Sequence, residues 1–173
     1  MNKTLLSTAL VAVMAAAAFA PTAQAAGGTI NISGKVLTDT CVVSVNGGST
    51  VVLPTVMSSS LNTVGAVAGA TPFSVGLTGC DTNTTSATMA FSGSNINTTT
   101  GNLNNTAASG SNVQVQLLNG ASVINTSLNT NAPVIAVAAG AGSASLKAQY
   151  IAATAAATAG LVSTTVNFTL TYL

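Results

Sequence analysis

Residues 160–173 of the chain read GLVSTTVNFTLTYL, and their side chains alternate between apolar and polar types. Period-two alternation is typical of a β-strand that buries one of its two faces. In this stretch one face carries Val162, Thr164, Val166, Phe168, Leu170 and Tyr172. The sequence therefore predicts a long, half-buried strand over residues 162–172.

Other strands are predicted along the rest of the chain. A second alternating segment covers residues 113–117, and the Asn119-Gly120 pair after it predicts a hairpin turn. Shorter runs of strand-forming residues, separated by clusters of Gly, Asn, Ser and Thr, cover residues 42–45, 50–53, 73–77, 87–91, 134–137 and 146–151. Many short strands without any long stretch of helical period indicate a single all-β domain, either a sandwich or a barrel.

Two segments do not fit the strand pattern. Residues 152–159 are almost all Ala and Thr, which favours a helix by propensity, but so short an isolated helix is only marginally stable. We interpret this segment as a loop between two strands. Residues 92–111 are rich in Asn, Thr and Gly and predict a solvent-facing loop with room for a short strand or turn.

The composition narrows the possible functions. The 173 residues include three basic and two acidic side chains, and no histidine, arginine, glutamate or tryptophan. Most side chains that perform acid-base catalysis are therefore missing, and we interpret Asp39 and Asp81 as solvated turn residues. So few cations exclude the phosphate contacts of nucleic-acid binding and a polybasic face for an anionic membrane. We predict that the chain is not an enzyme, has no cofactor or metal, and binds no nucleic acid or small-molecule substrate.

The first 25 residues have the pattern of a secretory signal peptide. Lys3 precedes an apolar run over residues 5–19, and Ala23-Gln24-Ala25 forms a small-residue cleavage motif. A transmembrane anchor is the competing interpretation, but the run has about 15 residues where a bilayer core needs about 20. We expect cleavage after Ala25 and export of residues 26–173.

The exported part retains two cysteines, Cys41 and Cys80. An even number of cysteines in an exported chain favours a disulfide bond, and two thiolates without histidine make a poor zinc site. Closing the loop between them would stabilise the fold by about 4 kcal/mol. A pair of reactive thiols is the alternative, although the cationic neighbours that activate thiols are absent nearby in the sequence.

The segment that follows the predicted cleavage site also alternates. Gly28, Ile30, Ile32, Gly34 and Val36 share one face of an extended strand. One interpretation is an ordinary first strand of the sandwich. The other is an arm that inserts into another molecule as a β-strand, because a free chain end is normally mobile unless it docks.

Taken together, these patterns resemble the structural subunits of chaperone-usher, type 1-like fimbriae. The resemblance covers residues 26–173. It rests on the alternation over 28–36, on Cys41 and Gly79-Cys80, and on the segments 52–54, 71–75, 113–119, 146–150 and 168–173. Its most specific features are Gly160, fourteenth from the C-terminus, and the penultimate Tyr172. They are similar to the family's β-zipper pattern for chaperone binding.

The resemblance implies an incomplete immunoglobulin-like β-sandwich that lacks its last strand. Residues 26–34 would be an N-terminal donor-strand arm and residues 35–173 the pilin domain. A hydrophobic groove would lie beside the C-terminal strand. The groove residues implied on that strand are Gly160, Val162, Val166, Phe168, Leu170 and Tyr172.

The resemblance also implies partners and an assembly route. In the periplasm, a pilus chaperone would fill the groove with one of its own strands. At the outer-membrane usher, the arm of the next subunit would replace the chaperone, with Gly28, Ile30, Ile32, Gly34 and Val36 as the donor residues. Repetition of this contact would give a homopolymer on the cell surface, outside the cell.

The function expected from the sequence is therefore that of a structural pilin, the main shaft subunit of an adhesive fibre. A minor or adaptor pilin of the same fimbria is the first alternative, and a soluble periplasmic β-sandwich binding module is the second. A sugar-binding tip adhesin is disfavoured, because related adhesins carry an additional lectin domain and lack a donor arm.

Overall fold

A computed structural model of the chain describes residues 31–34, 36, 41–46 and 49–173. The chain divides into two units, Met1–Lys35 and Val36–Leu173. The strands described below all belong to the second unit. The predicted signal peptide, residues 1–25, and the first part of the predicted arm, residues 26–30, lie outside the described residues.

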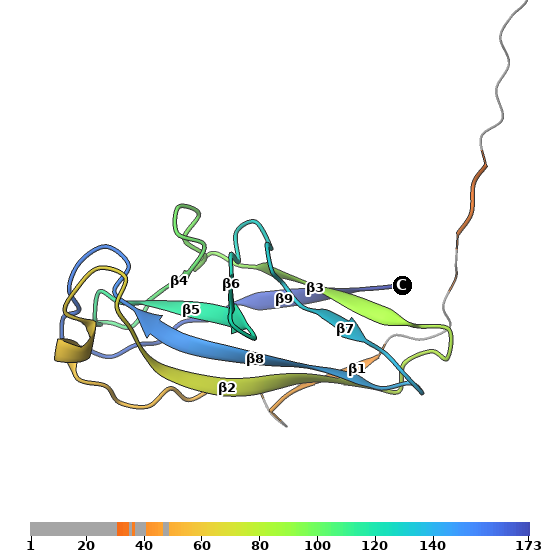
Figure 1. The fold of residues 1–173 in the computed structure, drawn as a ribbon, viewed down its shortest axis with the longest axis horizontal. Helices are drawn as coiled ribbons and strands as arrows, with labels where there is room; N and C mark the ends of the chain where they lie inside the picture. The colour runs from red at the N-terminus through yellow and green to blue at the C-terminus, as the bar shows by residue number, and fades with distance from the viewer. Residues whose placement is uncertain (1–30, 35, 37–40, 47–48) are drawn as a thin grey trace, which may run out of the picture. The chain divides into compact units, whose positions relative to one another are not determined.

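Two antiparallel sheets make up the second unit (Figure 1). The larger sheet has the strand order β1-β2-β8-β5-β4, with β6 paired to β5, and the smaller sheet has the order β7-β3-β9. The strands are β1 Val42–Val45, β2 Val67–Thr78, β3 Ser86–Ser92, β4 Leu103–Asn104, β5 Gln114–Asn119, β6 Ser122–Ile124, β7 Val134–Ala136, β8 Gly142–Ile151 and β9 Asn167–Tyr172. A 3-10 turn, η2, covers Ser58–Leu61.

The core lies between the two sheets. The larger sheet contributes side chains such as Leu77 and Leu146, and the smaller sheet contributes Met89 and Ile135, each about 1% exposed. Along β3 the buried residues recur at every second position, as expected for a strand with one face in the core. The predicted all-β sandwich is therefore confirmed.

Most of the predicted strands are confirmed, although β2 and β8 extend beyond the predicted 73–77 and 146–151. Residues 50–53 form no strand. The predicted strand over 162–172 is shorter, because β9 begins at Asn167, where the ladder with Ser92 of β3 begins. The predicted alternation is nevertheless present, since even-numbered residues from 162 to 172 are half-buried and their odd-numbered neighbours are exposed.

The hairpin predicted at Asn119-Gly120 is confirmed, with its loop one residue further along. Asn119 pairs with Ser122, so the two loop residues are Gly120 and Ala121. Gly120 has φ +62°, a left-handed conformation that glycine adopts at no steric cost. A glycine at the first of two loop positions is typical of a type II′ hairpin.

The prediction for one of the two loops is confirmed, and the prediction for the other is partly wrong. Residues 152–159 contain no helix, as predicted. Residues 92–111 contain β4, but the prediction that they face solvent is wrong for part of the segment: Leu103 and Asn102 are buried. Leu103 packs into the core, and the Asn102 side chain donates to Gln114 Oε1 at 3.2 Å and accepts from Gln116 Nε2 at 3.4 Å. These amide contacts hold the segment against β5, which no local pattern could reveal.

In the part of the chain that the structure describes, no helix has the length and apolar character needed to cross a bilayer. The same residues include no cluster of three or more His, Cys, Asp or Glu side chains that could hold a metal ion.

Candidate functional site

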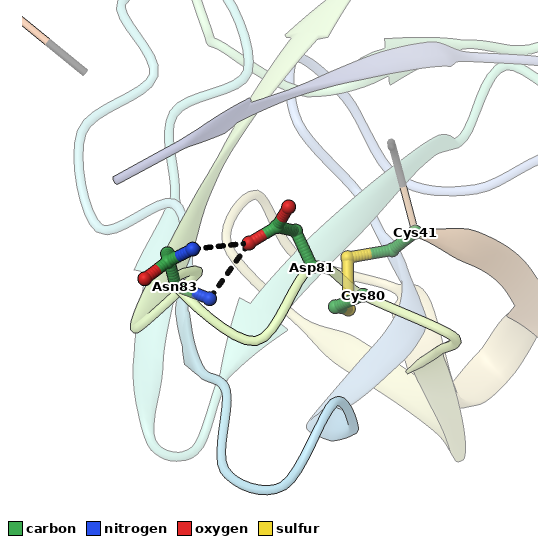
Figure 2. The surroundings of a disulfide bond; sticks show 4 residues. All are labelled: Cys41, Cys80, Asp81 and Asn83. Carbon is green, nitrogen blue, oxygen red and sulfur yellow. Dashed lines mark hydrogen bonds between the residues drawn. A yellow bond between two sulfur atoms is a disulfide. The ribbon is translucent and has the colours of Figure 1, made fainter. Parts of the chain in front are cut away.

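The predicted disulfide between Cys41 and Cys80 is present, with an S–S distance of 2.05 Å (Figure 2). It joins the residue before β1 to the segment after β2, and both sulfur atoms are therefore unavailable as reactive thiols. Asp81 follows Cys80, and its Oδ1 accepts hydrogen bonds from the Asn83 N–H at 2.7 Å and from Asn83 Nδ2 at 3.0 Å. Asp39, the other carboxylate singled out in the sequence, lies outside the described residues.

A cavity of about 510 Å³ opens into the sandwich core, and we call it the groove. One side is formed by residues 49–53, and the other by residues 162–166 with Phe168. Its floor consists of core side chains from β2, β3, β5 and β8. They include Val75, Met89, Phe91, Val115, Leu117 and Leu146.

The two sides of the groove do not pair with each other. No ladder joins residues 49–53 to residues 162–166 in the described part of the chain, and neither segment is a strand. Core side chains such as Val75 and Met89 are only 2% and 1% exposed, yet they line the cavity. The groove is therefore the place where the two sheets are not closed over their common core.

Among the described residues, segment 161–166 makes backbone hydrogen bonds along only one of its two edges. The Ser163 C=O accepts from the Thr106 N–H at 2.8 Å, and the Ser163 N–H donates to Asn105 Oδ1 at 2.8 Å. The Leu161 C=O accepts from the Ser111 N–H at 3.0 Å. Backbone groups of successive residues in an extended chain point to opposite edges, so those of Val162, Thr164 and Val166 point to the edge opposite the 105–111 loop.

The same edge continues along β9. Within the described residues β9 pairs only with β3, through six consecutive residue pairs from Ala87↔Tyr172 to Ser92↔Asn167. Its other edge has no ladder partner there. The chain from residue 162 to 172 thus offers alternate backbone N–H and C=O groups on one edge and half-buried side chains on the adjoining face, which is what an added strand requires.

The groove-strand residues predicted from the sequence fall on this face. Val162, Val166 and Phe168 line the groove, and Leu170 and Tyr172 pack against the same core cluster. Gly160, which precedes these residues in the chain, lies in the lining of a second cavity of about 510 Å³. A Cβ at Gly160 would lie 2.5 Å from the Ser111 backbone nitrogen, so the close approach to the 109–111 loop requires a glycine there.

Sequence reasoning missed the contribution of Tyr150. This residue lines the groove and the second cavity, as does Val162, so the two spaces meet around these side chains. Burial raises the pKa of the Tyr150 hydroxyl above its ordinary value. Its position in the run of strand-forming residues 146–151 predicted only that it belonged to a strand, because which strands enclose a cavity depends on contacts between distant segments.

Thr164 differs from the other polar side chains that line the groove in its hydrogen bonding. Its Oγ1 is buried and has no hydrogen-bond partner, the one such side-chain atom among the described residues. Neighbours on the same face, Val162 and Val166, are apolar. A buried hydroxyl without a partner destabilises the folded chain.

The predicted donor residues are only partly covered by the structure. Gly28 and Ile30 lie outside the described residues. Ile32 and Gly34 belong to the first unit and form neither strand nor helix. Val36 belongs to the second unit, where it is exposed and not part of a strand.

Comparison with known proteins places this chain in a family. A family model described as fimbrial protein matches residues 30–173. The chain is 43% identical to the F17 fimbrial protein of Escherichia coli over 94% of its own length and 96% of the relative's. It is 39% identical to the major fimbrial subunit SMF-1 of Stenotrophomonas maltophilia, over 87% of this chain and 95% of that one.

Solved structures share the immunoglobulin-like fold of pilus subunits. The P pilus rod subunit PapA superposes with a TM-score of 0.63 at 19% identity, over 78% of this chain and all of that one. Fimbriae lie on the cell surface, and their subunits are structural proteins rather than enzymes. From the family match and the two relatives together, this chain belongs to the fimbrial protein family and is a fimbrial subunit.

Proposed function

We propose that this subunit polymerises by donor-strand exchange and forms the main shaft of its fimbria. The observation that carries the proposal is the groove, a cavity lined by core side chains between two backbone segments that do not pair with each other in the described part of the chain. A docked strand with one apolar face would pair with the free edge of residues 162–172 and cover the groove floor.

The arm of a neighbouring copy is the proposed donor. Its pattern, Gly28-x-Ile30-x-Ile32-x-Gly34-x-Val36, presents apolar residues and glycines on one face and polar residues on the other. Full burial of Ile30 and Ile32 would contribute about 3 to 6 kcal/mol. In this proposal residues 1–25 are a signal peptide, 26–34 the donor arm and 35–173 the domain that receives the donor of another copy.

The same groove explains why partners would be needed before assembly. An unpaired edge over an apolar groove can pair with other chains and aggregate. We propose that a pilus chaperone fills the groove in the periplasm, with Gly160 and Tyr172 at the two ends of the segment it contacts, and that the outer-membrane usher exchanges it for an arm. A head-to-tail contact of this kind does not close on itself and therefore builds a filament.

A shaft role is favoured over a minor or adaptor role by one comparison. The relative with 39% identity is named as a major fimbrial subunit, and that chain matches over 95% of its length. Electron microscopy of cells that express this chain alone, and together with its chaperone and usher, tests the role directly. We expect long fibres labelled along their length by an antibody to this chain, and label confined to one end would contradict the shaft assignment.

The strand-exchange mechanism is tested separately with a synthetic peptide of residues 26–36. The peptide should bind the purified chain and raise its melting temperature. A matched peptide with Ile30 and Ile32 replaced by Asn should not. Equal effects of the two peptides would show that the groove does not select the apolar face of the arm.

A further inference from the structure

The central strand of the smaller sheet has two edges that are covered differently. β9 pairs with β3 from Ala87 to Ser92, whereas β7 pairs only with residues 86–88. The Met89 N–H donates to the Pro133 C=O at 3.0 Å, just before β7 begins. From Met89 to the end of β3 at Ser92, no strand covers the β7 side of β3 in the described part of the chain.

The side chain of Asn129 covers this remaining edge. The Phe91 N–H donates to Asn129 Oδ1 at 2.6 Å, and Asn129 Nδ2 donates to the Phe91 C=O at 3.3 Å. These are the two hydrogen bonds that a residue of a paired antiparallel strand would make with Phe91. The amide of Asn129 therefore takes the place of one strand residue.

The loop that carries Asn129 is held by its own hydrogen bonds. Asn125 Oδ1 accepts from the N–H groups of Ser127 and Leu128, each at 3.0 Å, and the Asn125 N–H donates to the Thr130 C=O at 3.1 Å. Asn129 has φ +56°, a left-handed conformation that asparagine tolerates better than most residues. The amide is thus presented to β3 by a structured loop.

We propose that Asn129 prevents strands of other copies from adding to β3 on its β7 side, so that strand addition to the smaller sheet is directed to the groove edge. This inference rests on the proposed function for the identity of the correct edge. An exposed strand edge is a template for pairing with another chain. The chain has few charges to prevent such pairing, since the charged residues among those described are Lys147 and Asp81, and neither lies on β3 or in the loop.

Pairing at the wrong strand edge is a particular hazard for a subunit that carries a donor arm. Each copy carries an alternating segment, residues 28–36, that is suited to pair with an open strand edge. An arm that paired at Phe91 would leave the groove of its neighbour empty and produce a branched or terminated assembly. Closing the wrong edge is therefore as necessary to ordered polymerisation as leaving the groove edge open.

The test uses the exported chain with a second copy of residues 26–36 attached after Leu173 through a flexible linker, so that its groove is filled. Asn129→Gly removes the amide, and Asn131→Gly is the matched control. Asn131 lies in the same loop with φ +62°, and its side chain bonds to the Val123 C=O at 2.9 Å rather than to β3. Glycine accepts either φ without strain, so the two variants differ mainly in the contact to Phe91.

We expect the Phe91 amide of Asn129→Gly to exchange its hydrogen at least about tenfold faster than in Asn131→Gly, a loss of protection typical of local opening. We also expect Asn129→Gly to form dimers and larger species, by size-exclusion chromatography with light scattering, at concentrations where Asn131→Gly is monomeric. Asn129→Asp keeps an acceptor for the Phe91 N–H and loses the donor to its C=O. Its exchange rate at the Phe91 amide and its tendency to form dimers should fall between those of the two glycine variants. It also allows both measurements if Asn129→Gly does not fold.

A monomeric Asn129→Gly variant, or unchanged exchange at Phe91, overturns the inference and leaves the proposed function intact. Polymerisation of the grafted chain before any substitution overturns both, because filling the groove would then not have stopped assembly.

Discussion

Phe168 of β9 lies directly opposite Phe91 of β3, and both rings line the groove. This cross-strand pair exists only in the observed register. A shift by one residue would turn Phe168 and every other half-buried side chain of β9 to the opposite face. The pairing of β9 with β3 therefore determines the chemistry of the groove as well as the stability of the smaller sheet.

Deletion of residues 26–33 tests the donor role of the arm. The shortened subunit retains the whole groove, so we expect it to be captured by the chaperone as well as the unchanged chain. It should not fill the groove of a neighbour, and electron microscopy should show no fibres. Fibres of normal length from the shortened chain would exclude this segment as the donor.

Attachment of residues 26–36 after Leu173 through a flexible linker tests whether the sandwich lacks a strand. Burial of Ile30 and Ile32 in the same molecule should contribute about 3 to 6 kcal/mol, which corresponds to a rise in melting temperature of about 10 °C or more for a domain of this size. The control carries Asn at both isoleucine positions. Equal melting temperatures of the graft and the control would contradict the missing-strand model.

Thr164→Val tests the cost of the unpartnered hydroxyl in the groove. Valine has the same shape and no polar atom, so we expect the free energy of unfolding of the isolated chain to rise by about 1 kcal/mol or more. Thr169→Val, at an exposed position of β9, controls for the higher strand propensity of valine. A change in urea midpoint that is the same for both variants would show that the Thr164 hydroxyl carries no such cost.

The stability of the chain should decrease in alkaline solution because of Tyr150. Burial raises the pKa of this hydroxyl above 10.0 in the folded chain. A phenol with a higher pKa in the folded state stabilises that state while the pH is below the unfolded value, and this contribution is lost as the pH rises through the folded pKa. We expect stability above pH 10 to fall more steeply for the unchanged chain than for Tyr150→Phe, measured by denaturant unfolding. Parallel pH profiles would be inconsistent with a Tyr150 pKa that partial burial raises.

Removal of the disulfide should destabilise the chain by an amount set mainly by the size of its loop. Cys41 and Cys80 are 39 residues apart, which corresponds to about 4 kcal/mol of loop-closure entropy. Cys41→Ala with Cys80→Ala should therefore lower the urea midpoint substantially and increase hydrogen exchange in β1, which the bond anchors beside β2. A double variant as stable as the unchanged chain would show that pairing of β1 with β2 does not depend on the bond.

Several features of the chain could be predicted because they are local in sequence. Alternation over residues 162–172 correctly identified which side chains face the core, and the even number of cysteines in a chain with a predicted export signal correctly predicted a disulfide. The Asn119-Gly120 pair correctly placed a hairpin. Each of these patterns reports on the conformation of a few neighbouring residues or on the composition of the whole chain.

The limits of β9 and the residues of the groove could not be predicted in the same way. Residues 162–166 have the alternation of a strand, but β3 ends at Ser92 and leaves them without a ladder partner in the smaller sheet. Tyr150 between the two cavities, and Asn129 opposite Phe91, act on residues far away in the sequence.

The sequence by itself determined that this protein is built from strands with one buried face and that residues 28–36 have the alternation of a strand. Only the tertiary structure decided which strand edges are closed and which remain open. The physical reason is that alternation depends on the backbone geometry of one segment, whereas an edge is closed by hydrogen bonds to another segment, and those depend on how the whole chain packs.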